Sequence, residues 1–137
     1  MPHDPVKIEE TRSWFRKAGD DLRAASVDME ADPPLLEDAL FHCQQAVEKA
    51  MKGFLSWHDQ PFRKTHSLTE LGIICSKLDP SLENILRSSA GLSEYATVYR
   101  YPGEAVPPSQ DEAASARELA EEVLSQLLAR LPAEITS

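Results

Sequence analysis

The feature that most constrains the fold is a series of apolar residues between positions 36 and 54 that repeats with the period of an α-helix. Because an α-helix has about 3.6 residues per turn, side chains separated by steps of three and four share one face. No segment shows the period-two alternation of a half-buried strand, so we expect an all-α protein. The members of the series are Leu36, Leu40, Cys43, Val47, Ala50 and Phe54.

Two kinds of helix-start signal separate this apolar stripe from similar ones along the chain. An Asp-Pro pair places an N-capping carboxylate before a proline that suits the first helical turn. In a capping box, a serine accepts from the amide of a glutamate whose side chain reaches back. The signals are Asp4-Pro5, Asp32-Pro33 and Asp79-Pro80, and Ser67 with Glu70 and Ser109 with Glu112. They predict helices over residues 5–30, 33–56, 68–78, 80–101 and 110–131.

The five expected helices define one domain that spans residues 1–137. Four are long, the one at residues 68–78 is short, and short polar turns connect them. This pattern predicts an up-and-down antiparallel four-helix bundle with an additional short helix. Each glycine inside a helix costs about 1 kcal/mol relative to alanine, so such glycines are interpreted as points of close helix approach. They are Gly19, Gly53, Gly72 and Gly91.

The chain is acidic, with 14 lysines and arginines, 23 aspartates and glutamates and a formal net charge of −9. We expect no DNA partner, because broad binding to nucleic acid needs many phosphate contacts. After Tyr101 the only lysines or arginines are Arg117 and Arg130, so most of the excess negative charge lies in the C-terminal segment. A local basic patch built from earlier segments remains compatible with this composition.

No uninterrupted apolar run approaches the roughly 20 residues that span a bilayer, and the N-terminal residues are polar and acidic. We therefore expect no membrane partner, no targeting peptide and a cytoplasmic location. Cys43 and Cys75 lie at apolar helical positions outside any C-x-x-C pattern. They are interpreted as buried free thiols rather than as a disulfide.

A polar ridge runs beside the apolar stripe of residues 33–56. His42, Gln45, Lys49 and Lys52 follow at steps of three, four and three, so they project from one side of the helix. Glu48 lies beside them and can pair with Lys52 one turn away. Two interpretations are open. The ridge is either a groove that holds phosphate and a base or sugar, or an ordinary solvated flank.

Two further clusters carry candidate binding groups. Arg63-Lys64-Thr65-His66 precedes the helix at residues 68–78, whose N-terminus favours anions except where Glu70 occupies it. Tyr99 and Arg100 lie near the end of residues 80–101, either as core and capping groups or as a base-stacking and phosphate-binding corner. His66 and Glu70 have the spacing of a metal pair without a third ligand, so we predict no metal site. General nucleotide-loop and hydrolase signatures are also lacking, and no cofactor is predicted.

An ordered set of short motifs resembles the HEPN family, small helical domains named for proposed nucleotide binding. The set covers most of the chain, from the first expected helix to Pro102 and loosely through the last helix. The matching stretches are residues 14–22 with the AGDDL pattern, residues 41–55 (FHCQQAVEKAMKGFL), Thr65-His66-Ser67-Leu68 with Leu71, and Tyr95-x-x-x-Tyr99-Arg100-Tyr101-Pro102.

The resemblance implies a helical bundle that commonly forms a homodimer and is often encoded beside a small nucleotidyltransferase as a toxin–antitoxin or related pair. Many members are metal-independent RNases that use an Arg, four to six further residues and then a His. This chain departs from that pattern, because two residues separate Arg63 from His66 and no His follows Arg100. No catalytic residue is therefore assigned. The binding set that carries over is His42, Gln45, Lys49, Lys52, His66, Tyr99 and Arg100.

We accordingly expect a dimeric module that binds a nucleotide or RNA and acts with a nucleotidyltransferase. In it, Lys49, Lys52 and Arg100 contact phosphate. One alternative is an RNase toxin with a rearranged site, in which His42 or His66 works with Arg100. The other is a helical adaptor without a ligand, which docks through an exposed apolar patch.

Overall fold

The computed structural model describes residues 2–96 and 106–136 of the chain. Within these two ranges all regular elements are helical and no strand occurs, which confirms the all-α prediction. The elements are α1 (Pro5–Glu30), α2 (Leu36–Trp57), α3 (Leu68–Leu78), η1 (Pro80–Leu82), α4 (Glu83–Ser89), η2 (Ala90–Ala96), α5 (Gln110–Leu128) and η3 (Ala133–Ile135), where η denotes a 3-10 helix.

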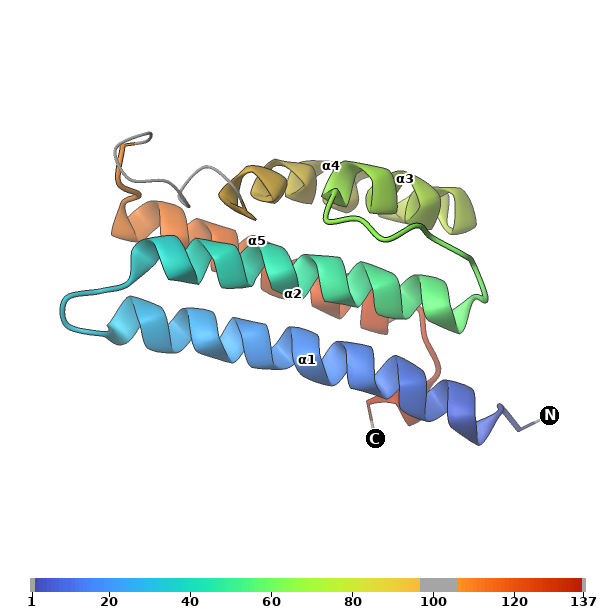
Figure 1. Ribbon diagram of the computed structural model, residues 1–137. Coiled ribbons are helices and arrows are strands. Elements are labelled where there is room, and N and C mark those ends of the chain that lie inside the picture. The colour runs from blue at the N-terminus through green and yellow to red at the C-terminus, as the bar shows by residue number, and fades with distance from the viewer. Residues whose placement is uncertain (1, 97–105, 137) are drawn as a thin grey trace.

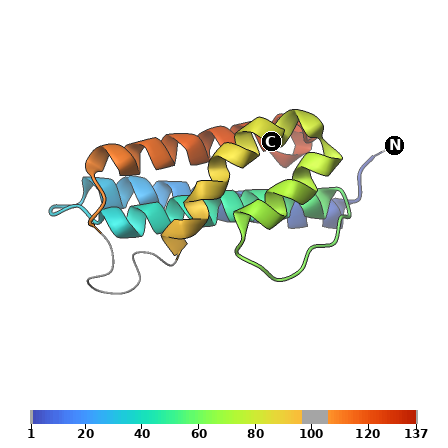
Figure 2. The ribbon, with the colours of Figure 1, turned by 90° about the horizontal axis from the view of Figure 1, so that it is seen from above.

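Helix α2 lies at the centre of the molecule. α1 runs antiparallel to it as the other arm of a hairpin, and α5 packs against both (Figure 1). On the side of α2 away from α1 lie α3 and α4, and the segment formed by α4 and η2 returns toward the end where α5 begins (Figure 2). The fourth side of the bundle is therefore built from these short elements rather than from a fourth long helix.

The two Asp-Pro signals nearest the N-terminus behave differently. Asp4 caps α1 as predicted, accepting from the amide of Val6 at 3.0 Å. The prediction that Asp32-Pro33 starts the second helix is wrong, because α2 begins at Leu36 and has no side-chain cap. Asp32 and Pro33 each precede a proline, and a residue before proline is disfavoured in the helical region. They form the turn between α1 and α2 instead.

The serine half of both capping boxes is confirmed. Ser67 accepts from the amide of Glu70 at 3.2 Å, and Ser109 accepts from the amide of Glu112 at 3.0 Å. The carboxylates of both glutamates instead accept hydrogen bonds from side chains elsewhere in the chain. The serine caps therefore predicted where α3 and α5 start. The two glutamates bind other side chains instead of completing the capping boxes.

The expectation of one long helix over residues 80–101 is wrong over the part that the structure describes. The helical segment α4 ends at Ser89 and continues as the 3-10 helix η2. Ser88, Ser89 and Gly91 cluster at the break, and Ser89 Oγ donates to the carbonyl of Leu86 at 2.8 Å. Glycine has low helix propensity, and serine hydroxyls compete for backbone hydrogen bonds, so the α-helix is weakened at this point.

Only one of the helical glycines marks a tight contact between helices. A Cβ atom on Gly53 would lie 2.8 Å from Trp14 Cβ and 3.0 Å from Phe15 Cε2, so α1 and α2 approach closely there. Gly72 has room for ordinary contact with Leu86, at 3.6 Å. The expectation is wrong for Gly19 and Gly91, where a Cβ would meet nothing within 4 Å.

The core is formed mainly by the apolar stripe of α2 and the residues that face it from the other helices. Cys43 and Cys75 lie in this core as free thiols, as predicted. Burial raises the pKa of each thiol to about 12. Among the helices that the structure describes, none combines the length and apolar character needed to cross a bilayer.

Candidate functional site

The predicted site residues divide into two clusters. His42, Gln45, Lys49 and Lys52 follow one another along α2, and His66 lies in the loop between α2 and α3. One cluster contains His42 and Lys49 and is centred on the buried carboxylate of Asp21. The other contains Gln45, Lys52 and His66 and is centred on the buried carboxylate of Glu48. Two further predicted residues, Tyr99 and Arg100, lie outside the described residues.

Asp21 of α1 is 7% exposed and joins α1 to α2. Its Oδ2 atom accepts a hydrogen bond from Lys49 Nζ at 2.6 Å, and its Oδ1 atom lies 2.8 Å from His42 Nδ1. Sequence reasoning did not assign Asp21 to the site. A signal was present, because Asp21 lies three residues after Ala18 and four before Ala25 and so falls on the apolar stripe of α1, whereas Asp20 does not.

Glu48 of α2 is 4% exposed and gathers three side chains. Oε2 accepts from Lys52 Nζ at 3.1 Å, the pairing that the helical spacing predicted. Oε1 lies 3.1 Å from Gln44 Nε2 and 2.9 Å from His66 Nδ1. Burial raises the pKa of Glu48, but the hydrogen bonds from these three side chains outweigh burial and lower the pKa below its ordinary value. Glu48 is therefore an ionised acceptor at neutral pH.

The pair formed by His66 and Glu48 joins the surface to the interior. The His66 side chain is 76% exposed, whereas that of Glu48 is 5% exposed. With Nδ1 donating to Glu48, the second ring nitrogen, Nε2, has no partner within the described ranges. A histidine held in this way presents Nε2 to solvent in a fixed orientation, suited to hydrogen bonding or proton transfer.

Gln44 and Gln45 support the Glu48 cluster. Gln44 is fully buried, and besides Glu48 it contacts the carbonyl of His66 at 3.4 Å. Gln45, the glutamine that the ridge pattern identified, donates to Gln44 Oε1 at 2.9 Å. Gln44 was missed because its position lies off the ridge, although it stands one turn before Glu48. The two glutamines therefore hold the acceptor of His66 in place.

Both ridge lysines have internal carboxylate partners. Lys49 is bound to Asp21, and Lys52, whose side chain is 10% exposed, is bound to Glu48. A phosphate at either lysine would have to compete with a charged hydrogen bond already present. These lysines therefore orient and neutralise Asp21 and Glu48.

The exposed cations near this cluster lie in the loop that carries His66. Arg63 is exposed and donates to Glu70 Oε1 at 2.7 Å. Lys64 is exposed and forms no ion pair with any described residue. Lys64 and the Nε2 atom of His66 are thus two polar groups of this loop without a side-chain partner among the described residues.

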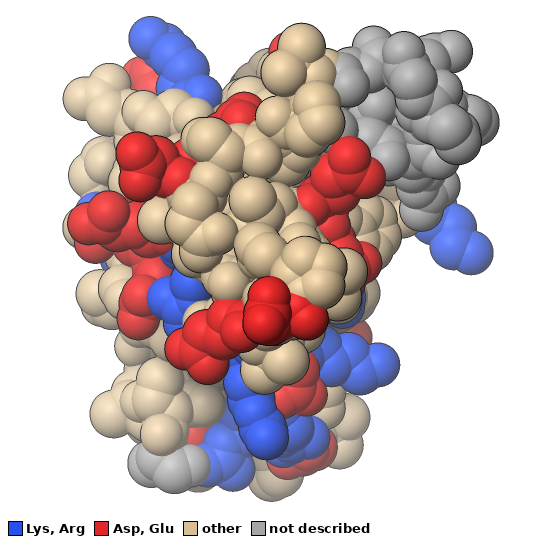
Figure 3. Space-filling model, turned by 90° about the vertical axis from the view of Figure 1, so that its left-hand side faces the viewer, with Lys and Arg blue, Asp and Glu red and all other residues tan. Residues whose placement is uncertain are grey.

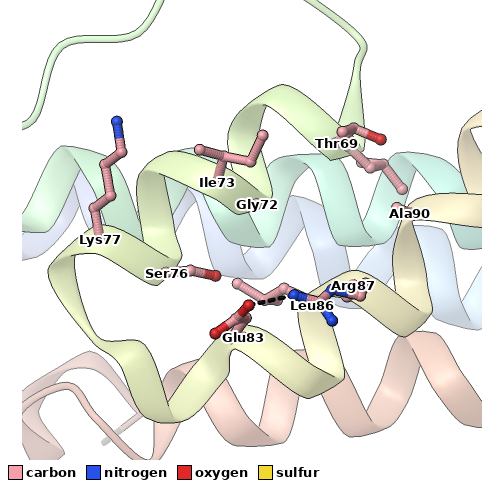
Figure 4. Close-up of a pocket in the computed structure, with 10 residues that line it drawn as sticks. Thr69, Gly72, Ile73, Ser76, Lys77, Glu83, Leu86, Arg87 and Ala90 are labelled. Atoms are coloured by element: carbon pink, nitrogen blue, oxygen red, sulfur yellow. Dashed lines mark hydrogen bonds and ion pairs between the residues drawn. The ribbon is translucent and has the colours of Figure 1, made fainter.

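A separate hollow of about 490 Å³ lies between α3 and α4 (Figure 4). Its floor is mainly apolar and includes Leu86 and Gly72, and an ion pair between Glu83 and Arg87 lies at its edge. None of the predicted site residues lines it. The candidate site is therefore the His66 loop and the adjoining part of α2, not the hollow between α3 and α4.

The HEPN domain family matches residues 11–130, which is most of the chain. The chain therefore belongs to the HEPN domain family, as the ordered motifs predicted. Comparison with curated proteins and with solved structures gave no match.

Proposed function

We propose that the protein is a HEPN module that binds a nucleotide or RNA through the loop of residues 63–66. The observation that carries the proposal is the hydrogen bond from exposed His66 to buried Glu48. Such an arrangement fixes a histidine at the surface without using its second nitrogen. It is a feature of a binding or proton-transfer group rather than of a histidine that only packs.

Each available group of the loop has a role in this proposal. Lys64 supplies positive charge to a phosphate, and His66 Nε2 hydrogen-bonds to a phosphate oxygen or a ribose hydroxyl. Lys49 and Lys52 act indirectly, because they hold Asp21 and Glu48. Tyr99 and Arg100 remain proposed ligand contacts on sequence grounds alone. A small contact of this kind is compatible with an acidic chain, because it needs only local positive charge.

We also propose that the module forms a homodimer and acts with a nucleotidyltransferase in a toxin–antitoxin-like pair. The support is membership of the HEPN family together with what the sequence resemblance implies. Light scattering on the purified chain measures the first property, and a dimer mass is expected. Affinity purification from native extract tests the second, with a nucleotidyltransferase identified by mass spectrometry as the expected partner. A monomer mass, or recovery of no nucleotidyltransferase, would contradict the respective part.

Binding is tested by fluorescence anisotropy with a labelled short RNA and by calorimetry with ATP and GTP. His66→Ala and Lys64→Ala should each weaken binding about tenfold or more, since each removes a direct contact. Lys17→Ala is the matched control, because Lys17 is an exposed lysine of α1 outside the loop. Equal affinity of all four proteins, or no binding to any probe, would refute the proposed site.

The pair formed by His66 and Glu48 also favours RNA cleavage as a second candidate function. In that reaction His66 Nε2 takes the proton of a ribose 2′-hydroxyl, the 2′-oxygen bonds to phosphorus, and the bond to the 5′-oxygen breaks. The leaving oxygen takes a proton from water, which gives a 2′,3′-cyclic phosphate and a 5′-hydroxyl end. Incubation of RNA with the protein, followed by end-group analysis, tests this function. Cleavage that persists in His66→Ala would exclude His66 as the base.

A further inference from the structure

A third cluster of polar side chains, which shares His42 with the Asp21 cluster, lies at the end of the bundle that holds the α1–α2 turn. Asp28 comes from the last part of α1, and Asp38 and His42 come from the first part of α2. One ligand atom from each of the three lies within 4.8 Å of the other two. The cluster therefore joins two carboxylates and one imidazole from helices that are adjacent in space.

Asp28 is the most buried member of the cluster, and its carboxyl group lies beside that of Asp38 and near His42. Its residue surface is 9% exposed, and Oδ2 is buried without a hydrogen bond to any described group. No lysine or arginine is among the described groups that act on Asp28. A buried carboxylate beside a second carboxylate needs a proton or a cation to be stable.

His42 is held with Nε2 toward Asp38 by a contact with Asp21 on the other side of its ring. Its Nδ1 atom is 2.8 Å from Asp21 Oδ1, and Asp21 is anchored in turn by Lys49. Because an ionised carboxylate only accepts hydrogen bonds, Nδ1 carries the proton. The other ring nitrogen, Nε2, lies 3.4 Å from Asp38 Oδ2, and with a metal ion in place of a second proton it would offer its lone pair. A histidine that donates to a carboxylate on one side and offers a lone pair on the other is the usual arrangement of a metal ligand.

We propose that Asp28, Asp38 and His42 bind one divalent transition-metal ion, Mn²⁺ or Zn²⁺, with water completing the coordination. Both ions accept imidazole together with carboxylate, whereas Mg²⁺ and Ca²⁺ prefer oxygen ligands throughout. Ligand atoms at about 2.1 Å from an ion lie about 3.0–3.5 Å apart. The 3.4 Å between His42 and Asp38 fits this value, and a carboxylate oxygen of Asp28 lies within 4.8 Å of both ligand atoms.

The surroundings of the cluster favour a cation. Asp and Glu side chains lie around a surface without charged residues at this end of the molecule, while most of the visible Lys and Arg lie toward the lower margin (Figure 3). Arg117 of α5 reaches Ser26 near the cluster, but its guanidinium is already bound to other groups. It contacts Ser26 Oγ at 2.5 Å and Glu121 at 2.8 Å. The Asp38 side chain is 54% exposed, which gives an ion a route from solvent.

The proposed metal site is independent of nucleotide or RNA binding. Its carboxylates are Asp28 and Asp38, and it lies at the end of α2 where that helix begins. It also changes the role of His42, from a base or sugar contact to a metal ligand. Asp21 becomes the residue that positions His42, and Lys49 the residue that anchors Asp21.

The test is calorimetry on the full chain after treatment with EDTA and dialysis, with MnCl₂, ZnCl₂ and MgCl₂ as separate probes. We expect one equivalent of Mn²⁺ or Zn²⁺ per chain and much weaker binding of Mg²⁺. Asp28→Asn and Asp38→Asn should each weaken binding about 100-fold, and Asp20→Asn, an exposed neighbour of Asp21, should leave it unchanged. Asp38 is exposed, so its variant keeps the test valid if Asp28→Asn does not fold.

Electron paramagnetic resonance of bound Mn²⁺ gives a second readout that does not depend on heat. Its spectrum should lose the bound signal in both metal-ligand variants and keep it in Asp20→Asn. Absence of saturable binding would overturn the proposal. Binding of several weak equivalents that the Asp28 and Asp38 substitutions leave unchanged would overturn it as well, since that result describes surface carboxylates only.

Discussion

The Nδ1 atom of His66 lies 2.9 Å from the Oε1 atom of Glu48, although His66 is exposed on a loop and Glu48 is buried in α2. This contact ties the loop to the core and brings a titratable ring to the surface in one orientation. It also makes the stability of the fold depend on the charge of Glu48, because Lys52 relies on the same carboxylate.

Glu48→Gln should lower the free energy of unfolding by about 3 kcal/mol at pH 7, because it leaves the buried Lys52 ammonium without its carboxylate. The effect depends on pH. The folded protein holds the pKa of Glu48 below its ordinary value of 4.5, so ionised Glu48 stabilises the fold above pH 4.5. That contribution is lost as pH falls through the folded-state pKa. Urea denaturation of both proteins from pH 7 to pH 3 should show their difference shrinking. A constant difference would contradict this assignment.

Gly53→Ala should destabilise the protein by about 1–3 kcal/mol, because the new methyl group would lie 2.8 Å from Trp14 Cβ and force α1 and α2 apart. Gly19→Ala is the matched control. It adds a methyl group to a helix position with nothing within 4 Å, so stability should rise by up to about 1 kcal/mol. Thermal unfolding followed by circular dichroism distinguishes the two. The same sign for both substitutions would contradict the close contact at Gly53.

The two cysteines should be unreactive in the native protein at pH 8. Burial raises the pKa of Cys43 and Cys75 to about 12, and the thiolate is the reactive form. Titration with a chromogenic disulfide should therefore detect no fast reaction in buffer and two thiols in guanidinium chloride. Fast modification of either cysteine in the native state would show that the core around it opens easily.

Asp21→Asn should weaken the junction between α1 and α2. It removes the charge that Lys49 and His42 share, and we expect a loss of about 1–3 kcal/mol in urea denaturation. Asp20→Asn changes an exposed neighbour and should alter stability by less than about 0.5 kcal/mol. Nitrogen NMR of the His42 ring gives an independent readout, since the Nδ1-protonated tautomer should dominate only while Asp21 is charged. An unchanged tautomer in Asp21→Asn would contradict the positioning role.

The contents of the candidate site show where sequence patterns stop being informative. The ridge on α2 and the pair of Glu48 with Lys52 follow from spacing within one helix, so the sequence predicted them. The partners Asp21 and His66 come from other segments, so their contacts depend on which face of α1 meets α2 and on how the loop folds back. The pairing of Asp28 with Asp38 across the α1–α2 turn is of the same kind.

Sequence alone determined the all-α class, the family and the starts of the helices capped by Asp4, Ser67 and Ser109, because period and capping act within a few residues. The tertiary structure located two local breaks that the apolar period did not show, at Ser89 in the fourth segment and before Leu36, where α2 begins. It also decided which charges would be buried. The physical reason is that a side chain's ionic partners are set by the packing of whole helices, which spacing along one helix does not encode.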